Sequence, residues 1–288
     1  MVLMSATAFG TLAIFAKLGY AAGLRTQQLL AFRFALAALG MVALAFLLGQ
    51  NPLRLRLREV ATLLAMGGLF YTTQSLTYFL ALRTLPASLV VLIAYIYPSL
   101  VVVAGWLFLH RSIAAWHLLA LIGSFAGVAM LVGGARFQIS WALALAIASP
   151  VVYTGYILVG ERVMSTAPAL AASAVIMTGA AFGFCLLAVL TRQLHLPSSM
   201  QAWSISIGVA LVPTMVAISL FLAALPRVGS ARAALLSTWE PVVTVILAVV
   251  LLGDRFSWIQ VIGGVLVLLA VVMVQMSRTL QQIEPPPG

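Results

Sequence analysis

Residues 78–109 read YFLALRTLPASLVVLIAYIYPSLVVVAGWLFL, and residues 221–252 read FLAALPRVGSARAALLSTWEPVVTVILAVVLL. One gap-free offset places Ala81 on Ala224 and Pro98 on Pro241, each proline in the middle of an apolar run. Matching apolar residues are common in so hydrophobic a chain. A proline at the same depth, with breaks at matching distances on both sides, is a stronger signal. The overlay therefore predicts that the two halves of the chain are copies of one unit.

The composition is that of a membrane protein. Of the 288 residues, 64% are hydrophobic and 7% are charged, whereas soluble domains carry about 25% charged residues. The formal net charge of +10 comes largely from arginines scattered singly between apolar runs, as in the loops of membrane proteins. Nucleic-acid binding is therefore excluded. The single cysteine, Cys185, rules out a disulfide framework and a cysteine-based zinc cluster.

Apolar runs separated by short breaks predict ten membrane-spanning helices. Each run can cross a hydrocarbon core of about 30 Å at about 1.5 Å per residue. The runs do not alternate polar with apolar residues as transmembrane β-strands do. Loops this short make successive helices antiparallel neighbours. The predicted spans are 3–22, 29–48, 60–82, 86–109, 115–134, 140–159, 168–190, 204–225, 231–252 and 257–276.

Half of ten spans is an odd number, so the second copy has to enter the membrane upside down. We therefore predict an all-α membrane protein with ten transmembrane helices in two inverted five-helix repeats. Transporters use this architecture, with a site at the repeat interface. The predicted units are a first repeat at 1–135, a second, inverted repeat at 136–278 and a disordered cytoplasmic tail at 279–288, which ends in a proline-rich stretch.

The second half of the chain resembles a known family. STWEPVV at 237–243, LLGDRF at 251–256 and IGGVL at 262–266 are similar to the repeat signature of the EamA-type permeases of the drug/metabolite transporter superfamily. In the first half, Tyr97-Pro98 stands in place of Glu-Pro, and Leu109-His110-Arg111 in place of the Gly-Glu-Arg turn. The chain most resembles the bacterial aromatic amino-acid exporters of that superfamily. The resemblance implies ten helices, two inverted repeats, an inner-membrane location and solute export.

Polar residues inside the spans predict a solute path. On the third span they recur at i, i+3, i+4 and i+7 and so share one face, which should avoid lipid. Phenols and hydroxyls with little fixed charge suit a neutral, partly apolar or zwitterionic solute. Alternatively, these residue types hydrogen-bond helices to one another. The candidate substrate-binding residues are Tyr71, Gln74, Ser75, Tyr78, Tyr95, Tyr97, Tyr153, Ser237, Trp239 and Glu240, with Tyr156 and Ser149 also on the sixth span.

Glu240 is the acid that the sequence places near the bilayer centre, where a carboxylate is costly unless it is paired, protonated or hydrated. Three roles stay open: binding a substrate ammonium, pairing with Arg232, or carrying a proton. Lys17 and Arg33 lie within one or two turns of the outer ends of their helices. We expect both side chains to extend to the membrane interface.

Prolines inside the spans predict hinges. Each proline frees the carbonyl four residues before it. Those on the fourth and ninth spans lie near the midplane, where freed carbonyls could bind a substrate ammonium. Alternatively, the membrane helices tolerate these prolines without any function. The candidate hinges are Pro98, Pro150, Pro213 and Pro241.

The arginine bias predicts that both termini are cytoplasmic, in a bacterial inner membrane. The predicted cytoplasmic segments hold Arg54, Arg56, Arg58, Arg111, Arg162, Arg227 and Arg278, and the outer loops hold Arg25, Arg83, Arg136, Arg192 and Arg255.

The chain lacks the sequence patterns HExxH, GxxxxGK[ST] and GxSxG. With three histidines and five acids at no ligand spacing, we predict no enzyme, no metal, no cofactor and no obligate protein partner. The predicted function is a secondary transporter or facilitator that exports aromatic and other neutral amino acids by alternating access. Its expected partners are the small solute and membrane lipid. Two alternatives are an EamA-type exporter of other small metabolites or hydrophobic drugs, and a non-transporting membrane scaffold.

Overall fold

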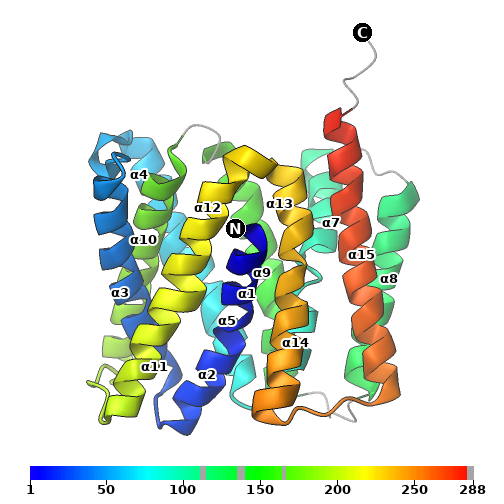
Figure 1. The fold of residues 1–288 in the computed structure, drawn as a ribbon, viewed down its shortest axis with the longest axis horizontal. Coiled ribbons are helices and arrows are strands. Elements are labelled where there is room, and N and C mark those ends of the chain that lie inside the picture. Colours follow the sequence, from blue (N-terminus) through cyan, green and yellow to red (C-terminus); the bar gives the residue numbers. More distant parts are fainter. Residues whose placement is uncertain (111–114, 135–139, 164–166, 284–288) are drawn as a thin grey trace.

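The computed structural model describes residues 1–110, 115–134, 140–163 and 167–283, and every regular element in this part is helical (Figure 1). The elements are α1 (Val2–Gly10), α2 (Leu12–Ala21), α3 (Thr26–Leu47), η1 (Pro52–Arg54), α4 (Leu57–Ala65), η2 (Met66–Tyr71), α5 (Thr72–Leu82), α6 (Ala87–Ala94), α7 (Tyr97–Leu109), α8 (Ala115–Gly134), α9 (Trp141–Val163), α10 (Ala169–Leu190), α11 (Met200–Ala210), η3 (Leu211–Val216), α12 (Ala217–Val228), α13 (Ser230–Ser237), α14 (Trp239–Leu252) and α15 (Trp258–Ile283).

Each predicted span coincides with one helix or with helices that follow one another directly. In the described part, nine helical segments are long and apolar enough to cross a membrane. The third predicted span is the continuous run α4–η2–α5, which is more polar than the others. The last helix, α15, runs to Ile283 and takes in the first residues of the predicted tail. Arg111, Arg136 and residues 284–288 lie outside the described residues.

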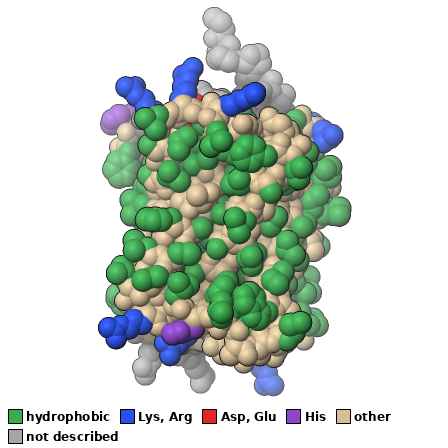
Figure 2. All heavy atoms as spheres, turned by 90° about the vertical axis from the view of Figure 1, so that its left-hand side faces the viewer, with side chains coloured by type: hydrophobic (Ala, Val, Ile, Leu, Met, Phe, Trp, Pro, Cys, Tyr) green, Lys and Arg blue, Asp and Glu red, His purple; other side chains and the backbone are tan. Residues whose placement is uncertain are grey.

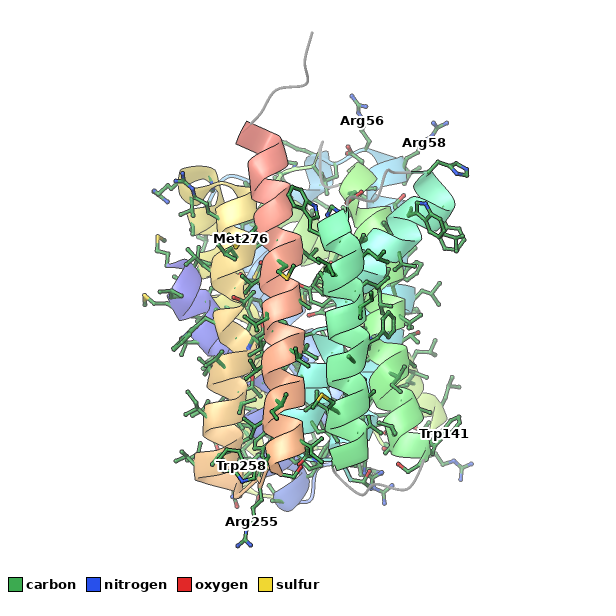
Figure 3. All side chains as sticks on the ribbon, turned by 90° about the vertical axis from the view of Figure 1, so that its right-hand side faces the viewer. Arg56, Arg58, Trp141, Arg255, Trp258 and Met276 are labelled. Carbon is green, nitrogen blue, oxygen red and sulfur yellow. The ribbon has the colours of Figure 1, made fainter. Side chains whose placement is uncertain are left out.

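The surface of the bundle is apolar between two charged ends. Figure 2 shows one face on which hydrophobic side chains cover the middle and Lys and Arg side chains lie at both ends. In Figure 3, Arg56 and Arg58 point away from one end, and Arg255 points away from the other. Trp141 and Trp258 lie near the Arg255 end and are 79% and 84% exposed. Tryptophans beside arginines at the rim of an apolar surface fit the membrane–water interface.

Two of the four candidate hinge prolines follow breaks in the helices. α6 ends at Ala94 and α7 starts at Tyr97, so Pro98 falls in the first turn of α7. α13 ends at Ser237 and α14 starts at Trp239, so Pro241 falls in the first turn of α14. A first turn tolerates proline because the missing N–H has no partner there. Main-chain breaks thus lie at matching places in the two halves.

The other two candidate hinge prolines lie inside helical structure. Pro150 lies within α9, which continues on both sides of it. Pro213 lies in η3, a π-helical turn that joins α11 to α12. A further proline, Pro226, lies inside α12 because that helix extends beyond the predicted end of the eighth span.

Helices far apart in sequence pack closely. α3 packs along α10, α8 along α15, α5 along α9, and α1 against both α12 and α14. Small residues allow helices to approach closely. A Cβ atom at Gly127 would come within 2.6 Å of the Gly263 carbonyl oxygen, and a Cβ atom at Gly263 within 2.6 Å of the Gly127 carbonyl oxygen. Glycine at a helix crossing lets backbones meet in this way within membranes.

The loop before α15 stabilises the start of α6. Asp254 accepts hydrogen bonds from the Ser88 N–H at 3.1 Å and the Ser88 hydroxyl at 2.6 Å. The Lys17 ammonium donates to the Leu85 carbonyl at 2.6 Å and is within electrostatic range of Asp254. A carboxylate at a helix N-terminus accepts from unpaired N–H groups and complements the helix dipole. Lys17 therefore bonds within the protein, at the loop that leads into α6.

Candidate functional site

Six of the seven tyrosines gather in one place, which we call the tyrosine cluster. Successive ring centroids are 5.9 Å apart for Tyr95–Tyr97, 4.9 Å for Tyr97–Tyr153, 5.6 Å for Tyr153–Tyr156 and 5.7 Å for Tyr156–Tyr71. The sixth member, Tyr78, is described below with the charged groups. The rings come from η2, α5, the α6–α7 junction and α9, which join the first half of the chain to the second.

Glu240 of α14 lies at one side of the tyrosine cluster. The Tyr95 hydroxyl donates to Glu240 Oε2 at 2.8 Å and lies 3.2 Å from the Ser237 carbonyl oxygen. That carbonyl is the one that Pro241 leaves without its helical partner, as the sequence predicts. The Ser237 hydroxyl instead donates to the Ala233 carbonyl at 2.8 Å. Ser237 therefore contributes a main-chain oxygen to this region.

Helix α1 holds the turn that carries Glu240. A Cβ atom at Gly10 would lie 2.9 Å from Val243 and 3.0 Å from the Glu240 carbonyl oxygen, so this contact requires glycine. The Thr244 hydroxyl donates to the Gly10 carbonyl at 2.9 Å. The chain leaves α1 at this point and restarts at Leu12 in α2. The ends of α1, α6 and α13 therefore meet around the turn that carries Glu240.

The predicted polar face of the third span divides in the structure. Gln74 donates to the Ser149 hydroxyl of α9 at 3.1 Å, and Ser75 donates to the Gln74 side-chain oxygen at 3.2 Å. Gln74 therefore hydrogen-bonds α5 to α9, which is the alternative role considered for these residue types, and Ser75 supports its side chain. Tyr71 and Tyr78 belong to the tyrosine cluster.

Arg33 of α3 is buried, and the expectation that it extends to the interface was wrong. Its side chain is 2% exposed, and its Nε donates to the Thr214 hydroxyl at 3.0 Å. The guanidinium carbon lies 4.6 Å from the centre of the Phe34 ring and 5.5 Å from that of Phe79. Aromatic faces and a hydroxyl hold the guanidinium inside the bundle and compensate part of its charge.

Thr214 lies midway along the predicted eighth span, which is helical from Met200 to Val228. It belongs to η3, and its hydroxyl donates to the Val209 carbonyl five residues back at 2.9 Å. Thr72, just after η2, makes the same bond to the Gly67 carbonyl at 2.9 Å. When the two halves are aligned so that Pro98 matches Pro241, η2 and η3 also overlap. π-helical turns of this kind are frequent at functional sites.

Tyr78 lies near both charged groups of this region, Glu240 and Arg33. It is buried and within electrostatic range of both Glu240 and Arg33. Tyr71 is half-buried and within hydrogen-bonding reach of the guanidinium of Arg33. The Glu240 carboxylate and the Arg33 guanidinium therefore both lie beside the tyrosine cluster.

Two residues close to Glu240 in the sequence, Trp239 and Arg232, have exposed side chains. The Trp239 side chain is 43% exposed, and the Arg232 side chain is also exposed. The described hydrogen-bond partner of Glu240 is Tyr95. In the described part of the chain, His, Cys, Asp and Glu side chains nowhere form a group of three that could hold a metal ion.

Arg33 and Thr214 belong to this region, although neither was predicted from the sequence as a site residue. An arginine between Phe32 and Phe34, inside an otherwise apolar helix, was the available signal. Its depth is set by contacts with Thr214 and Phe79 on other helices, which spacing along α3 cannot reveal. Tyr156 was noted on the sixth span, and the structure adds it to the tyrosine cluster.

Comparison with known proteins shows the family. The sequence profile of the EamA-like transporter family matches residues 1–133 and 140–276. The uncharacterized transporter YcbK of Bacillus subtilis (strain 168) is 28% identical over 120 residues, which are 40% of this chain and 38% of that protein. A protein of known crystal structure shares the fold over 96% of both chains, with a TM-score of 0.68 and 20% identity. Since the profile matches nearly the whole chain, this multi-pass membrane protein belongs to the EamA-like transporter family.

Proposed function

We propose that the protein is a secondary transporter or facilitator that exports aromatic and other neutral amino acids across the bacterial inner membrane, with both termini in the cytoplasm. The observation that carries this proposal is the tyrosine cluster with Glu240 at its side, deep among apolar helices. Tyr71, Tyr97, Tyr153, Tyr156 and Glu240 are half-buried, so each retains accessible surface in this region.

The chemistry of these side chains favours a small solute with an aromatic or apolar part. Phenol rings bind such groups by stacking and edge contacts, and their hydroxyls bind polar ends. A carboxylate inside a membrane protein is functional by default because of its cost there. Glu240 provides the negative charge that an ammonium group requires. The surroundings contain no cluster of cations that would suit a phosphate or polyanion among the described residues.

Several features support ten spans in two inverted repeats. The family profile matches once in each half, at 1–133 and at 140–276. The offset that aligns Pro98 with Pro241 also aligns Tyr95 with Thr238, so the helix breaks coincide. In Figure 1 the start of α4 and the start of α11, equivalent under this offset, lie at opposite ends of the bundle. Equivalent segments at opposite ends are what an inverted repeat requires.

Alternating access would use the helix breaks. Main-chain breaks after α6 and α13 lie beside Glu240, with Pro98 and Pro241 in the turns that follow. We propose these two turns as hinges that let the helices rock around the solute. Pro150 and Pro213 are weaker candidates because α9 is continuous and η3 remains helical.

Efflux from proteoliposomes tests the proposal. Vesicles containing the purified protein are loaded with labelled phenylalanine, tyrosine, leucine, glutamate or a hydrophobic cationic dye, and efflux is followed with and without a pH gradient. We expect efflux of the neutral amino acids above protein-free vesicles. Efflux of the dye alone would favour a drug exporter, and no efflux of any solute would favour a non-transporting scaffold.

A further inference from the structure

We propose that Arg33, held by Thr214, binds the carboxylate of the solute while Glu240 binds its ammonium group. The site would then select zwitterions, molecules that carry both charges, over amines, amides and carboxylic acids of the same shape. This inference rests on the proposed function, and it adds a specificity-determining residue to it.

The first support is the neutral surroundings of Arg33. An arginine stays protonated in proteins, so its charge inside the bundle must be compensated. The described neighbours are the Thr214 hydroxyl, the Phe34 and Phe79 rings, the phenol of Tyr71 and, within electrostatic range, that of Tyr78. Cation–π contacts compensate only part of a buried charge.

The acids of the described part have other partners or lie at the ends of helices. Asp254 accepts from Ser88, and Glu240 accepts from Tyr95. Glu59 accepts from the Arg56 N–H at the start of α4, and Glu161 is exposed near the end of α9. A solute carboxylate is therefore the anion that this arrangement leaves for Arg33.

The second support is the donor geometry. A guanidinium has five N–H donors in a planar fork that matches the two oxygens of a carboxylate. Nε donates to Thr214, which fixes the plane of the fork against η3. Tyr71, in hydrogen-bonding reach of the guanidinium, is half-buried and contacts Tyr156. Tyr71 thus joins the buried cation to the accessible part of the tyrosine cluster, where a carboxylate would replace or join its hydroxyl.

The third support is the position of the two charges relative to the rings. Tyr78 is within electrostatic range of both Arg33 and Glu240, so both charges lie near this one phenol. The ring contacts that run from Tyr95 to Tyr71 lead from Glu240 towards Arg33. A zwitterion bound between Arg33 and Glu240 would have its carboxylate at Arg33, its ammonium at Glu240 and its side chain against phenol rings.

A purely structural role for Arg33 makes a different prediction. Arg33 contacts Phe79 of α5 and Thr214 of η3, so it could serve to hold α3 in place. Its removal would then weaken binding of every solute by the same factor. A carboxylate-binding role predicts that only solutes with a carboxylate lose affinity.

Competition for binding of labelled L-phenylalanine to the purified, detergent-solubilised protein separates the two roles. The competitors are L-phenylalanine, L-phenylalaninamide, which lacks the carboxylate, and 3-phenylpropanoate, which lacks the ammonium. In the wild type we expect each analogue to compete about tenfold more weakly or worse, as expected for loss of a charged hydrogen bond. In Arg33→Gln the amide should compete as well as the amino acid, while Arg33→Lys should retain part of the preference. Lys17→Gln, which removes a cation outside the tyrosine cluster, should leave the wild-type preference unchanged.

The comparison of two competitors within one preparation corrects for lost stability. If Arg33→Gln fails to fold, the wild-type preference and Thr214→Val, which should reduce that preference, decide the question. Equal competition by L-phenylalanine and its amide in the wild type would overturn the inference and leave the proposed function standing. An equal loss of affinity for L-phenylalanine and for its amide in Arg33→Gln would also overturn the inference, in favour of a structural role. Failure of the wild type to bind L-phenylalanine would contradict the proposed function and this inference together.

Discussion

The Tyr95 hydroxyl and the Glu240 carboxylate share a hydrogen bond of 2.8 Å that joins the two halves of the chain. Tyr95 lies in the break between α6 and α7, and Glu240 lies in the first turn after the break between α13 and α14. Tyr95 is therefore attached to main chain that leaves the regular helix, and Glu240 lies just after such a break. Movement of either broken helix would change this bond, and with it the access of a solute to the carboxylate.

Tyr95→Phe removes this donor without changing the ring. Glu240 and the Ser237 carbonyl would lose their common partner, which should lower stability by about 1–3 kcal/mol and alter transport. The matched control is Tyr20→Phe, because the Tyr20 hydroxyl donates to the Phe79 carbonyl at 2.7 Å outside the tyrosine cluster. Thermal melting should show similar losses in both variants, while efflux should change only in Tyr95→Phe. Equal efflux in the two variants would argue against a transport role for the Tyr95 bond.

Glu240→Gln distinguishes the roles of the carboxylate. If Glu240 binds an ammonium group, the variant should bind amino acids more weakly at every pH. If it carries a proton, the response of efflux to a pH gradient should disappear while exchange between labelled and unlabelled solute survives. Unchanged affinity, pH response and expression would mean that Glu240 has no mechanistic role.

The double change Glu240→Gln with Arg232→Gln tests the ion-pair alternative. Because Arg232 is exposed and Glu240 accepts from Tyr95, we expect the second change to restore nothing. Recovery of efflux or stability in the double variant would show that the two residues form a pair.

Gly10→Ala tests the contact that positions Glu240. The added Cβ atom would lie 2.9 Å from Val243 and 3.0 Å from the Glu240 carbonyl, so α1 would have to move away from α14. We expect slower efflux and a loss of roughly 1–3 kcal/mol of stability, as for overpacked interiors. Gly133→Ala is the control because its Cβ atom would have no neighbour within 4 Å. Wild-type efflux in Gly10→Ala would show that this close approach is dispensable.

Asp254→Ala tests the cap on α6. The Ser88 N–H and hydroxyl would lose their acceptor, which should cost about 0.5–2 kcal/mol, the usual range for a lost helix cap. Arg255→Gln should leave the melting temperature unchanged, since Arg255 points away from the bundle (Figure 3). A melting temperature for Asp254→Ala equal to that of Arg255→Gln would contradict the capping role.

The sequence predicts the helices well because apolar runs and prolines are local signals. The breaks before Pro98 and Pro241 follow from the missing proline N–H and needed no tertiary information. The sequence predicts the depth of Glu240, but the hydrogen bond from Tyr95 is known only from the structure. Partners on other helices were not predictable in this way. Gln74 and Tyr78 share one periodic face of α5, yet Gln74 hydrogen-bonds to Ser149 and Tyr78 lies in the tyrosine cluster.

Arg33 shows the same limit more sharply. Its distance from the helix end allows an extended side chain that reaches the interface. The structure instead buries it, because Phe34, Phe79 and Thr214 together form a neutral environment with one good acceptor. Only the fold brings α5 and η3 against α3, so the local sequence could not decide between the two placements.

In the proposed mechanism the tyrosine cluster lines the solute path, and labelling of Tyr153→Cys in a Cys185→Ser background is the decisive test. Tyr153 is half-buried, stacks on Tyr156 and meets Tyr97 edge-on. A membrane-impermeant methanethiosulfonate reagent is applied to each side of proteoliposomes, with and without L-phenylalanine. We predict that the introduced cysteine reacts from at least one side and that L-phenylalanine slows the reaction. Absence of reaction from both sides, or a rate unaffected by L-phenylalanine and by every other solute that the protein transports, would contradict the account.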